Sequence, residues 1–285
     1  MEIEDTSNNI IVCEQGIYLY MKDYISSFLT FINGTLMLVN KPEDVNCAKE
    51  NTRYFFVQKL PNNENKYLPN VYLINTEQAT RQVYWNMLSH TLNSNIKVLD
   101  YSPENIQILN NHPNISLLPY QYNENEVSLL KKYLSETPKI YDVVFVGYLS
   151  QDRAQMLNEL RNKSLNLQVL YLDGKWGEER DKIIASCKIL LNLHCSKDYN
   201  VYETPRCDRW VFAGMIVISE TSLAYQNLDI APLVIFKEKK DIVSTVVDVI
   251  NNFDKYQEIQ QIKYNQHIDK IKLDRLEKIN NVLKL

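Results

Sequence analysis

The segment from Lys188 to Glu220 constrains the fold of this chain more than any other part of the sequence. Its apolar run at 189–194 predicts a buried strand, its polar run at 195–203 a loop, and 205–213 a helix followed by a second strand at 215–219. Thr204 is a residue type that caps helices, and Pro205 suits a first helical turn, where no backbone N–H is needed. Gly214 follows the helix at the position where the chain often turns into a left-handed conformation, which glycine adopts at the lowest cost. Two buried strands joined through a helix predict a parallel sheet covered on both faces.

The rest of the chain repeats this alternation in two halves. In the first half, strands are predicted at 10–13, 35–39, 54–57, 71–74, 96–99 and 115–118, and helices at 17–32, 78–88, 103–109 and 124–134. In the second half, further strands are predicted at 142–147, 167–172 and 233–236, and helices at 152–161, 177–186, 239–252 and 254–285. The predicted fold class is therefore α/β, with two doubly wound parallel sheets. We expect an amino-terminal domain over 1–137, a second domain over 138–252, and an amphipathic helix over 253–285 that packs on them.

Charged and polar side chains follow the strands of the second half where their helices begin. A helix N-terminus beside the carboxyl end of a parallel strand presents free N–H groups and a partial positive charge, which favours a phosphate group. Glu203 and Arg206 flank the start of the helix at 205–213, and His194 ends the strand before it. This arrangement predicts an anion-binding site at the carboxyl edge of the second sheet.

The same segment resembles the donor-binding segment of the group 1 glycosyltransferases, retaining enzymes of the two-domain GT-B fold. The run Leu191–His194 is similar to the end of a strand in many members of this family. The strand at 217–219 is similar to the strand that follows the helix in those members. Arg206, Ala213 and Gly214 match residues of the helix between these strands in the family. The glutamate that usually holds the nucleotide ribose is replaced here by Arg209. The resemblance implies a GT-B-like fold with two Rossmann-like domains facing a cleft. It also implies transfer of a sugar, without a metal or other cofactor, from a UDP-sugar or GDP-sugar to a glycan or glycoprotein acceptor.

Further site residues follow from the resemblance and from position at strand ends. The candidate catalytic residues are Glu77, His194 and Glu203, with Glu77 as the acceptor-side base and Asp100 as the second choice for that base. The candidate donor-binding residues are Gly147, Tyr148, Arg153, Thr204, Arg206, Arg209, Ser219 and Glu220. Gly147 ends a strand just before a helix, so its loop is expected to approach the donor diphosphate.

Composition narrows the class of protein. A net charge of −4 argues against a nucleic-acid-binding protein, which usually shows a basic face. No apolar run approaches the roughly 20 residues that cross a bilayer, and the five irregularly spaced cysteines predict reduced thiols in a cytoplasmic compartment, that of a host if the protein is viral. The absence of paired aspartates favours chemistry without a metal, and the bias toward Asn, Ile, Lys and Tyr indicates a low-GC microbe or a large DNA virus.

Two alternatives stay open. Arg209 in place of the glutamate favours a GT-B-like protein whose donor site has decayed and which acts as a binding or scaffold protein. A nucleotide-sugar epimerase shares the two-sheet plan, but it needs several carboxylates and histidines in its site, and this chain has four histidines in all.

Overall fold

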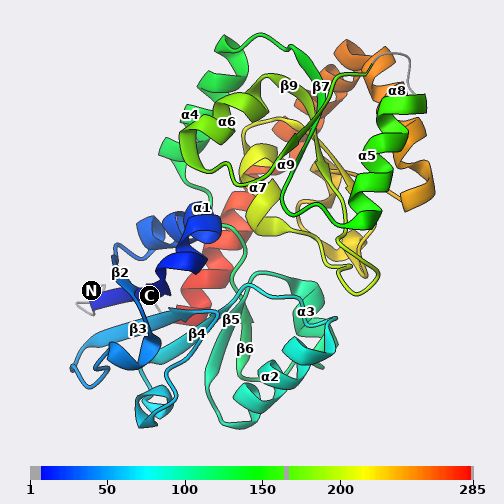
Figure 1. Cartoon of the computed structure of the whole chain (residues 1–285). Helices are drawn as coiled ribbons and strands as arrows, with labels where there is room; N and C mark the ends of the chain where they lie inside the picture. The colour runs from blue at the N-terminus through cyan, green and yellow to red at the C-terminus, as the bar shows by residue number, and fades with distance from the viewer. Residues whose placement is uncertain (1–7, 164–166, 284–285) are drawn as a thin grey trace. The chain divides into compact units, whose positions relative to one another are not determined.

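The computed structural model describes residues 8–163 and 167–283 (Figure 1). The chain divides into two compact units: unit 1 is Met1–Asn123 with Asp274–Leu285, and unit 2 is Glu124–Leu273. These limits differ from the expected domains 1–137, 138–252 and 253–285. Helix α4 (Glu124–Glu136) belongs to unit 2 because it packs on α6 (Gly177–Ala185) and α7 (Thr204–Phe212).

The long helix α9 (Phe253–Leu283) contributes to both units. Its last part belongs to unit 1, where Arg275 donates a hydrogen bond to the Tyr120 carbonyl at 2.8 Å. Arg53 donates to the Leu283 carbonyl at 3.2 Å near the end of the helix. The predicted long terminal helix is confirmed, and these contacts explain why it does not form a separate part.

Unit 1 holds an all-parallel sheet in the order β2-β1-β3-β4-β5-β6. The strands are β1 (Asn8–Glu14), β2 (Thr35–Val39), β3 (Thr52–Val57), β4 (Val71–Asn75), β5 (Lys97–Asp100) and β6 (Ile115–Leu117). The helices are α1 (Gln15–Phe31), α2 (Gln82–Asn93) and α3 (Pro103–Ile108). Every residue of β4 is buried, as expected of a strand covered on both faces.

Unit 2 holds a second all-parallel sheet, in the order β11-β10-β9-β7-β8. The strands are β7 (Tyr141–Val146), β8 (Val169–Leu172), β9 (Cys187–Asn192), β10 (Ile216–Glu220) and β11 (Ile235–Lys237). Helices α5 (Gln151–Lys163) and α8 (Ile242–Asn251) complete the unit with α4, α6, α7 and α9. Apolar residues of β7, β9, β10, α5 and α8 form its core. Together with the sheet of unit 1, this strand order confirms the two predicted parallel sheets.

Three local predictions require correction. The helix predicted at 78–88 begins only at Gln82, because the residues before it form a loop held by side-chain hydrogen bonds described below. Strand β9 ends at Asn192, two residues before the predicted end. Thr204 is the first residue of α7, and Glu203, without a side-chain capping bond, takes the N-cap position predicted for Thr204. Gly214 does adopt the predicted left-handed conformation, with φ +89°.

Candidate functional site

The carboxyl edge of the unit 2 sheet contains a topological switch point between β7 and β9. The chain runs from β7 outward to β8, and then returns to place β9, β10 and β11 on the other side of β7. Open α/β sheets bind ligands where the strand order reverses in this way. Gly147 follows β7 at this point with φ +129°, a backbone conformation that residues other than glycine rarely adopt.

Arg206 lies over this switch point, in the first turn of α7. A Cβ atom added to Gly147 would lie only 3.2 Å from Arg206 Nη2, so the glycine leaves room for the guanidinium. The polar contacts of Arg206 are long: Nη1 is 3.5 Å from Asn192 Oδ1, and Nη2 is 3.6 Å from Glu203 Oε2. With 22% of the side chain exposed, Arg206 keeps hydrogen-bond donors that a ligand can engage.

Arg153 is buried beside Arg206, and each of its three guanidinium nitrogens donates a hydrogen bond to a backbone carbonyl. Its Nε and Nη2 donate to the Leu193 carbonyl at 2.9 and 2.7 Å, and its Nη1 donates to the Tyr148 carbonyl at 2.8 Å. Arg153 therefore ties together the loops that follow β7 and β9. Burial and the nearby Arg206 charge lower the pKa of Arg153 from its ordinary value.

The two guanidinium groups share one aromatic ring. The Cζ of Arg153 lies 4.9 Å and that of Arg206 5.6 Å from the centroid of Phe145, at the end of β7. Two neighbouring positive charges repel each other, and an anion between or above them relieves that repulsion. This edge of unit 2 is therefore suited to a phosphate or diphosphate group.

Arg209, one turn along α7, has a different environment. Its Nη1 and Nη2 donate to the two carboxylate oxygens of Asp181 at 2.9 and 2.8 Å, and Nη2 lies 2.7 Å from Glu126 Oε1. Only 4% of the Arg209 side chain is exposed. The structure thus places Arg209 in a buried ion cluster that joins α4, α6 and α7, and does not bring it to the Arg206 group.

Polar side chains also join the ends of β9 and β10. Asn192 donates to Ser219 Oγ at 3.0 Å, and that hydroxyl donates to the Glu220 carbonyl at 2.8 Å. The carboxylate of Glu220, only 6% exposed, accepts a hydrogen bond from the His194 backbone N–H. The His194 ring places Nε2 3.1 Å from the Thr221 carbonyl. His194, Ser219 and Glu220 thus meet at this edge, whereas Tyr148 is 70% exposed.

In unit 1, Asp100 is completely buried at the end of β5. Its carboxylate accepts hydrogen bonds from Asn75 Nδ2 at 2.6 Å, the Ser102 N–H at 2.8 Å and Asn105 Nδ2 at 3.0 Å. Burial raises the pKa of Asp100 to about 7, and the three hydrogen bonds act in the opposite direction. A carboxylate enclosed in this way supports the surrounding loop.

Glu77 lies in the loop that this network supports, just after β4. Its N–H donates to Asn75 Oδ1 at 3.1 Å, and its carbonyl accepts from Asn75 Nδ2 at 2.8 Å and Asn105 Nδ2 at 2.9 Å. Its carboxylate, 24% exposed, accepts from Gln58 Nε2 at 3.3 Å and lies 4.0 Å from Arg81 Nη1. Sequence reasoning missed Gln58, Asn75 and Asn105, although the left-handed Gln58, with φ +63°, follows β3 at the switch point of this sheet.

Among the described residues, no group of three or more His, Cys, Asp or Glu side chains is placed to hold a metal ion. None of the helices in the described ranges is long and apolar enough to cross a membrane.

Relatives of the chain are found in Acanthamoeba polyphaga mimivirus. Uncharacterized protein L140 is 36% identical over 249 residues, which cover 85% of this chain and 80% of L140. The chain belongs to this mimivirus protein family. Uncharacterized proteins L137 and L138 are also 36% identical and match 87% and 95% of this chain, but the chain spans only 34% and 32% of their lengths. No family model matches the sequence. The viral alternative drawn from composition agrees with these relatives.

One solved structure identifies the fold. The structure of T4 phage BGT in complex with UDP and Mn2+ matches 97% of this chain and 100% of its own, with a TM-score of 0.52 and 12% identity. An alpha1,3-fucosyltransferase structure matches 90% of this chain and 82% of its own, with a TM-score of 0.49 and 11% identity. At this identity the T4 phage BGT match shows the fold alone, and it confirms the predicted GT-B-like architecture.

Proposed function

We propose that this chain is a glycosyltransferase domain that binds a nucleotide diphosphate-sugar at the carboxyl edge of unit 2. The observation that supports it best is Arg206, which lies above Gly147 at the switch point with only long polar contacts. T4 phage BGT, which shares this fold, was solved in complex with UDP. The donor class proposed for this chain is a UDP-sugar or a GDP-sugar.

The donor diphosphate would bind between the α7 N-terminus and the loop after β7. Arg206 offers two parallel N–H groups to phosphate oxygens, an arrangement that arginine provides better than lysine. The N-terminal dipole of α7 adds a partial positive charge at the same place. Charge that develops on the departing diphosphate would be stabilised by these groups without a metal ion, and the bond to the sugar would then break more easily.

Arg153 acts on the donor through the loops that it holds. Because its donors are taken by the Leu193 and Tyr148 carbonyls, it fixes the backbone on both sides of the switch point. Its charge adds to that of Arg206 without a direct bond to the ligand. Glu220 is the candidate for the ribose hydroxyls, since Arg209 is held by Asp181 and Glu126.

On the acceptor side, Glu77 is the proposed base for a hydroxyl of a glycan or glycoprotein. Its carboxylate is partly exposed, while its backbone is held at both the N–H and the carbonyl. Asp100 is better suited to support this loop than to remove a proton, because it is completely buried.

A binding protein with a decayed donor site is the second candidate. It is favoured by the Arg209–Asp181 ion pair, which places an arginine where the resembling family has its ribose-binding glutamate. The two candidates differ in whether a nucleotide-sugar binds with useful affinity. An epimerase would convert the nucleotide-sugar with no acceptor present.

Calorimetric titration and thermal shift with UDP, GDP and their sugar conjugates test the proposal. A donor at a thousandfold excess over its Kd should stabilise the protein by ~4 kcal/mol. Arg206→Ala should abolish most of that gain, and the matched variant Lys263→Ala, an exposed position on α9, should keep it. If no nucleotide or nucleotide-sugar binds the wild-type protein, the decayed-site alternative is the better account.

A further inference from the structure

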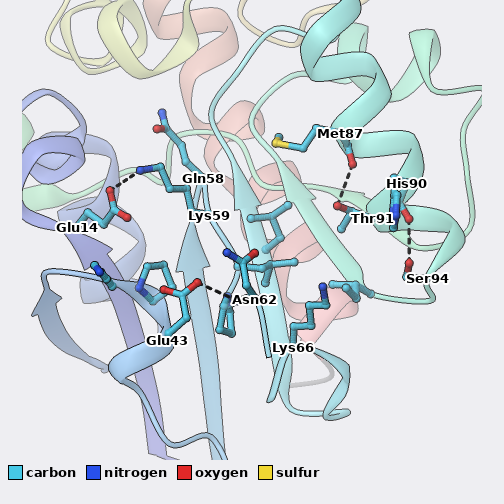
Figure 2. A pocket seen from close by; sticks show the side chains of 16 residues that line it. Glu14, Glu43, Gln58, Lys59, Asn62, Lys66, Met87, His90, Thr91 and Ser94 are labelled. Carbon is cyan, nitrogen blue, oxygen red and sulfur yellow. Dashed lines mark hydrogen bonds and ion pairs between the residues drawn. The ribbon is translucent and has the colours of Figure 1, made fainter. Parts of the chain in front are cut away.

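A pocket of about 450 Å³ lies in unit 1 (Figure 2). Its residues come from the turn Pro42–Asp44, the connection from β3 to β4, and the second half of α2. Figure 2 shows Lys66, Asn62 and Glu43 on one side, and His90 and Thr91 of α2 with Ser94, which follows the helix, on the other. The volume falls within the range of roughly 300–1,000 Å³ that is usual for small-molecule sites.

The pocket combines an apolar floor with polar groups that remain free to bind a ligand. Leu73 and Ile96, 2% and 5% exposed, belong to the floor. Thr91 and Ser94 donate their hydroxyl protons to the carbonyls of Met87 and His90, so their oxygens can accept hydrogen bonds. An apolar surface with hydroxyl and amide groups around it fits the two faces of a sugar ring.

The charges of the pocket favour an anionic ligand. Three lysines and two glutamates line it, which gives one excess positive charge in a chain whose net charge is −4. Lys59 pairs with Glu14 at 2.6 Å, and Glu43 accepts a hydrogen bond from the Asn62 N–H at 3.0 Å. Backbone hydrogen bonds, followed by the charges of Lys41 and Lys59, lower the pKa of Glu43.

Lys66 is available to a ligand together with Lys41, whose charge also acts on Glu43. Neither ammonium group has a carboxylate oxygen within 4.0 Å in the described part of the chain, and Lys66 lies 5.1 Å from the Tyr67 ring centroid. A ligand with one phosphate or carboxylate group would neutralise the excess charge of the pocket.

Gln58 connects the pocket to Glu77. Gln58 lines the pocket, and its Nε2 donates hydrogen bonds to Thr76 Oγ1 at 2.5 Å and Glu77 Oε1 at 3.3 Å. Tyr20 donates to Gln58 Oε1 at 3.0 Å, so the amide of Gln58 is held from both sides. A ligand in the pocket would therefore have one end near the carboxylate that we propose as the base.

We infer that this pocket binds the acceptor, and that the acceptor is a small saccharide bearing one anionic group. The inference rests on the proposed function, because it gives the ligand of the pocket the role of acceptor. The anionic group lies between Lys41 and Lys66, the apolar face of the sugar rests on Leu73 and Ile96, and a hydroxyl points toward Glu77. A phosphate ester and a uronic acid share this chemistry.

The test is titration of the full chain, without nucleotide, with glucose, glucose 6-phosphate, glucuronate and inorganic phosphate. His90 is one of four histidines and lines the pocket, so its ring proton NMR signals, assigned with His90→Gln, report binding there. Either or both anionic sugars should bind about tenfold or more tightly than glucose, since one charge-assisted contact has that effect. The phosphate and carboxylate arms identify which anionic group the pocket prefers.

Lys41→Gln and Lys66→Gln should each weaken binding of the anionic sugar about threefold to fivefold and leave glucose unchanged. Lys97→Gln is the matched control, because Lys97 is exposed on β5 and stacks on the Tyr72 ring outside the pocket. Equal binding of glucose and both anionic sugars, an equal loss in the control, or unmoved His90 signals would overturn the inference.

Failure of the proposed function has a different signature. If glucose 6-phosphate binds as expected but no nucleotide-sugar binds, the pocket stands as an anionic saccharide site and its role as the acceptor site falls. If nucleotide-sugar binds and is consumed with neutral glycans alone, the donor site stands and this acceptor class is wrong.

Discussion

Replacement of Arg206 by alanine should separate ligand binding from stability. The guanidinium has polar contacts of 3.5 Å and 3.6 Å, and part of it is exposed. Such contacts contribute well under ~1 kcal/mol to folding. Removal of Arg206 also relieves its repulsion of the buried Arg153. We therefore expect the melting temperature of the ligand-free Arg206→Ala protein to stay within ~2 °C of wild type or to rise slightly.

The cost should appear in donor binding. A charge-assisted hydrogen bond contributes on the order of 1.5–3 kcal/mol, and Arg206 can direct two parallel N–H groups at one diphosphate. A loss of about 2–3 kcal/mol corresponds to roughly 30-fold to 150-fold weaker binding of UDP or GDP. Isothermal titration calorimetry on the intact chain measures this ratio directly.

Arg209→Ala is the matched comparison, three residues further along the same helix. Its guanidinium is buried against Asp181 and Glu126, and loss of one partner from a buried ion pair costs about 3–5 kcal/mol. Arg180 still lies 2.7 Å from Asp181, so we expect the lower end, about 3 kcal/mol, or a fall of roughly 6–12 °C in melting temperature. Nucleotide binding by the folded fraction should change little.

The two variants are therefore expected to differ, with Arg206→Ala losing nucleotide affinity and Arg209→Ala losing stability. If Arg206→Ala binds nucleotide as tightly as wild type, the diphosphate does not bind at the β7–β9 switch point. If Arg206→Ala unfolds as readily as Arg209→Ala, both arginines are structural and the decayed-site alternative gains support.

Four further predictions concern the carboxyl edges of the two sheets. Gly147→Ala should weaken nucleotide binding tenfold or more by calorimetry, because a Cβ 3.2 Å from Arg206 Nη2 displaces the guanidinium; normal affinity would contradict this role. Glu220→Gln should weaken UDP binding but leave pyrophosphate binding unchanged, since only UDP has ribose hydroxyls; equal losses would exclude a ribose contact. The raised pKa of Asp100 favours its protonated form in the folded state, so its contribution to stability falls as pH rises from about 4 to about 7, by up to ~4 kcal/mol. Urea unfolding of wild type and Asp100→Asn should show a steeper loss in wild type across that window, and parallel pH curves would contradict it. Chelator should leave transfer unchanged, whereas activity lost with chelator and restored by manganese would show that a metal neutralises the diphosphate.

The fold was predictable because its signals are local. Short apolar runs predicted every strand of both sheets, and Gly214 predicted the end of α7, since buried parallel strands and helix stops depend on neighbouring residues. The start of α2 was not predictable in this way. Its loop is fixed by the bond of Asn75 to Asp100, 25 residues away, and nothing near Asn75 in the sequence reveals that partner.

The three arginines named as donor-binding candidates show the same limit more clearly. The sequence makes Arg153, Arg206 and Arg209 all candidates for donor contacts, with Arg209 in the place of the usual glutamate. The structure distinguishes them by partners 40 residues from Arg153, at Leu193, and 28 residues from Arg209, at Asp181. Whether a charged side chain is free for a ligand depends on these long-range contacts, and sequence spacing does not contain them.

Arg209 also bears on the proposed donor site, because the resembling family has a glutamate at this position. A glutamate at this position would face Asp181 and Glu126, and three carboxylates in one buried cluster would repel strongly. The arginine, the two carboxylates and Arg180 form a compensated set, so a glutamate at position 209 would need changes on α4 or α6. If the chain binds a nucleotide-sugar as proposed, the ribose contact comes from another element. Glu220 occupies the neighbouring strand end, where its carboxylate already accepts the His194 N–H, and this makes it the residue whose substitution decides between an altered donor site and a lost one.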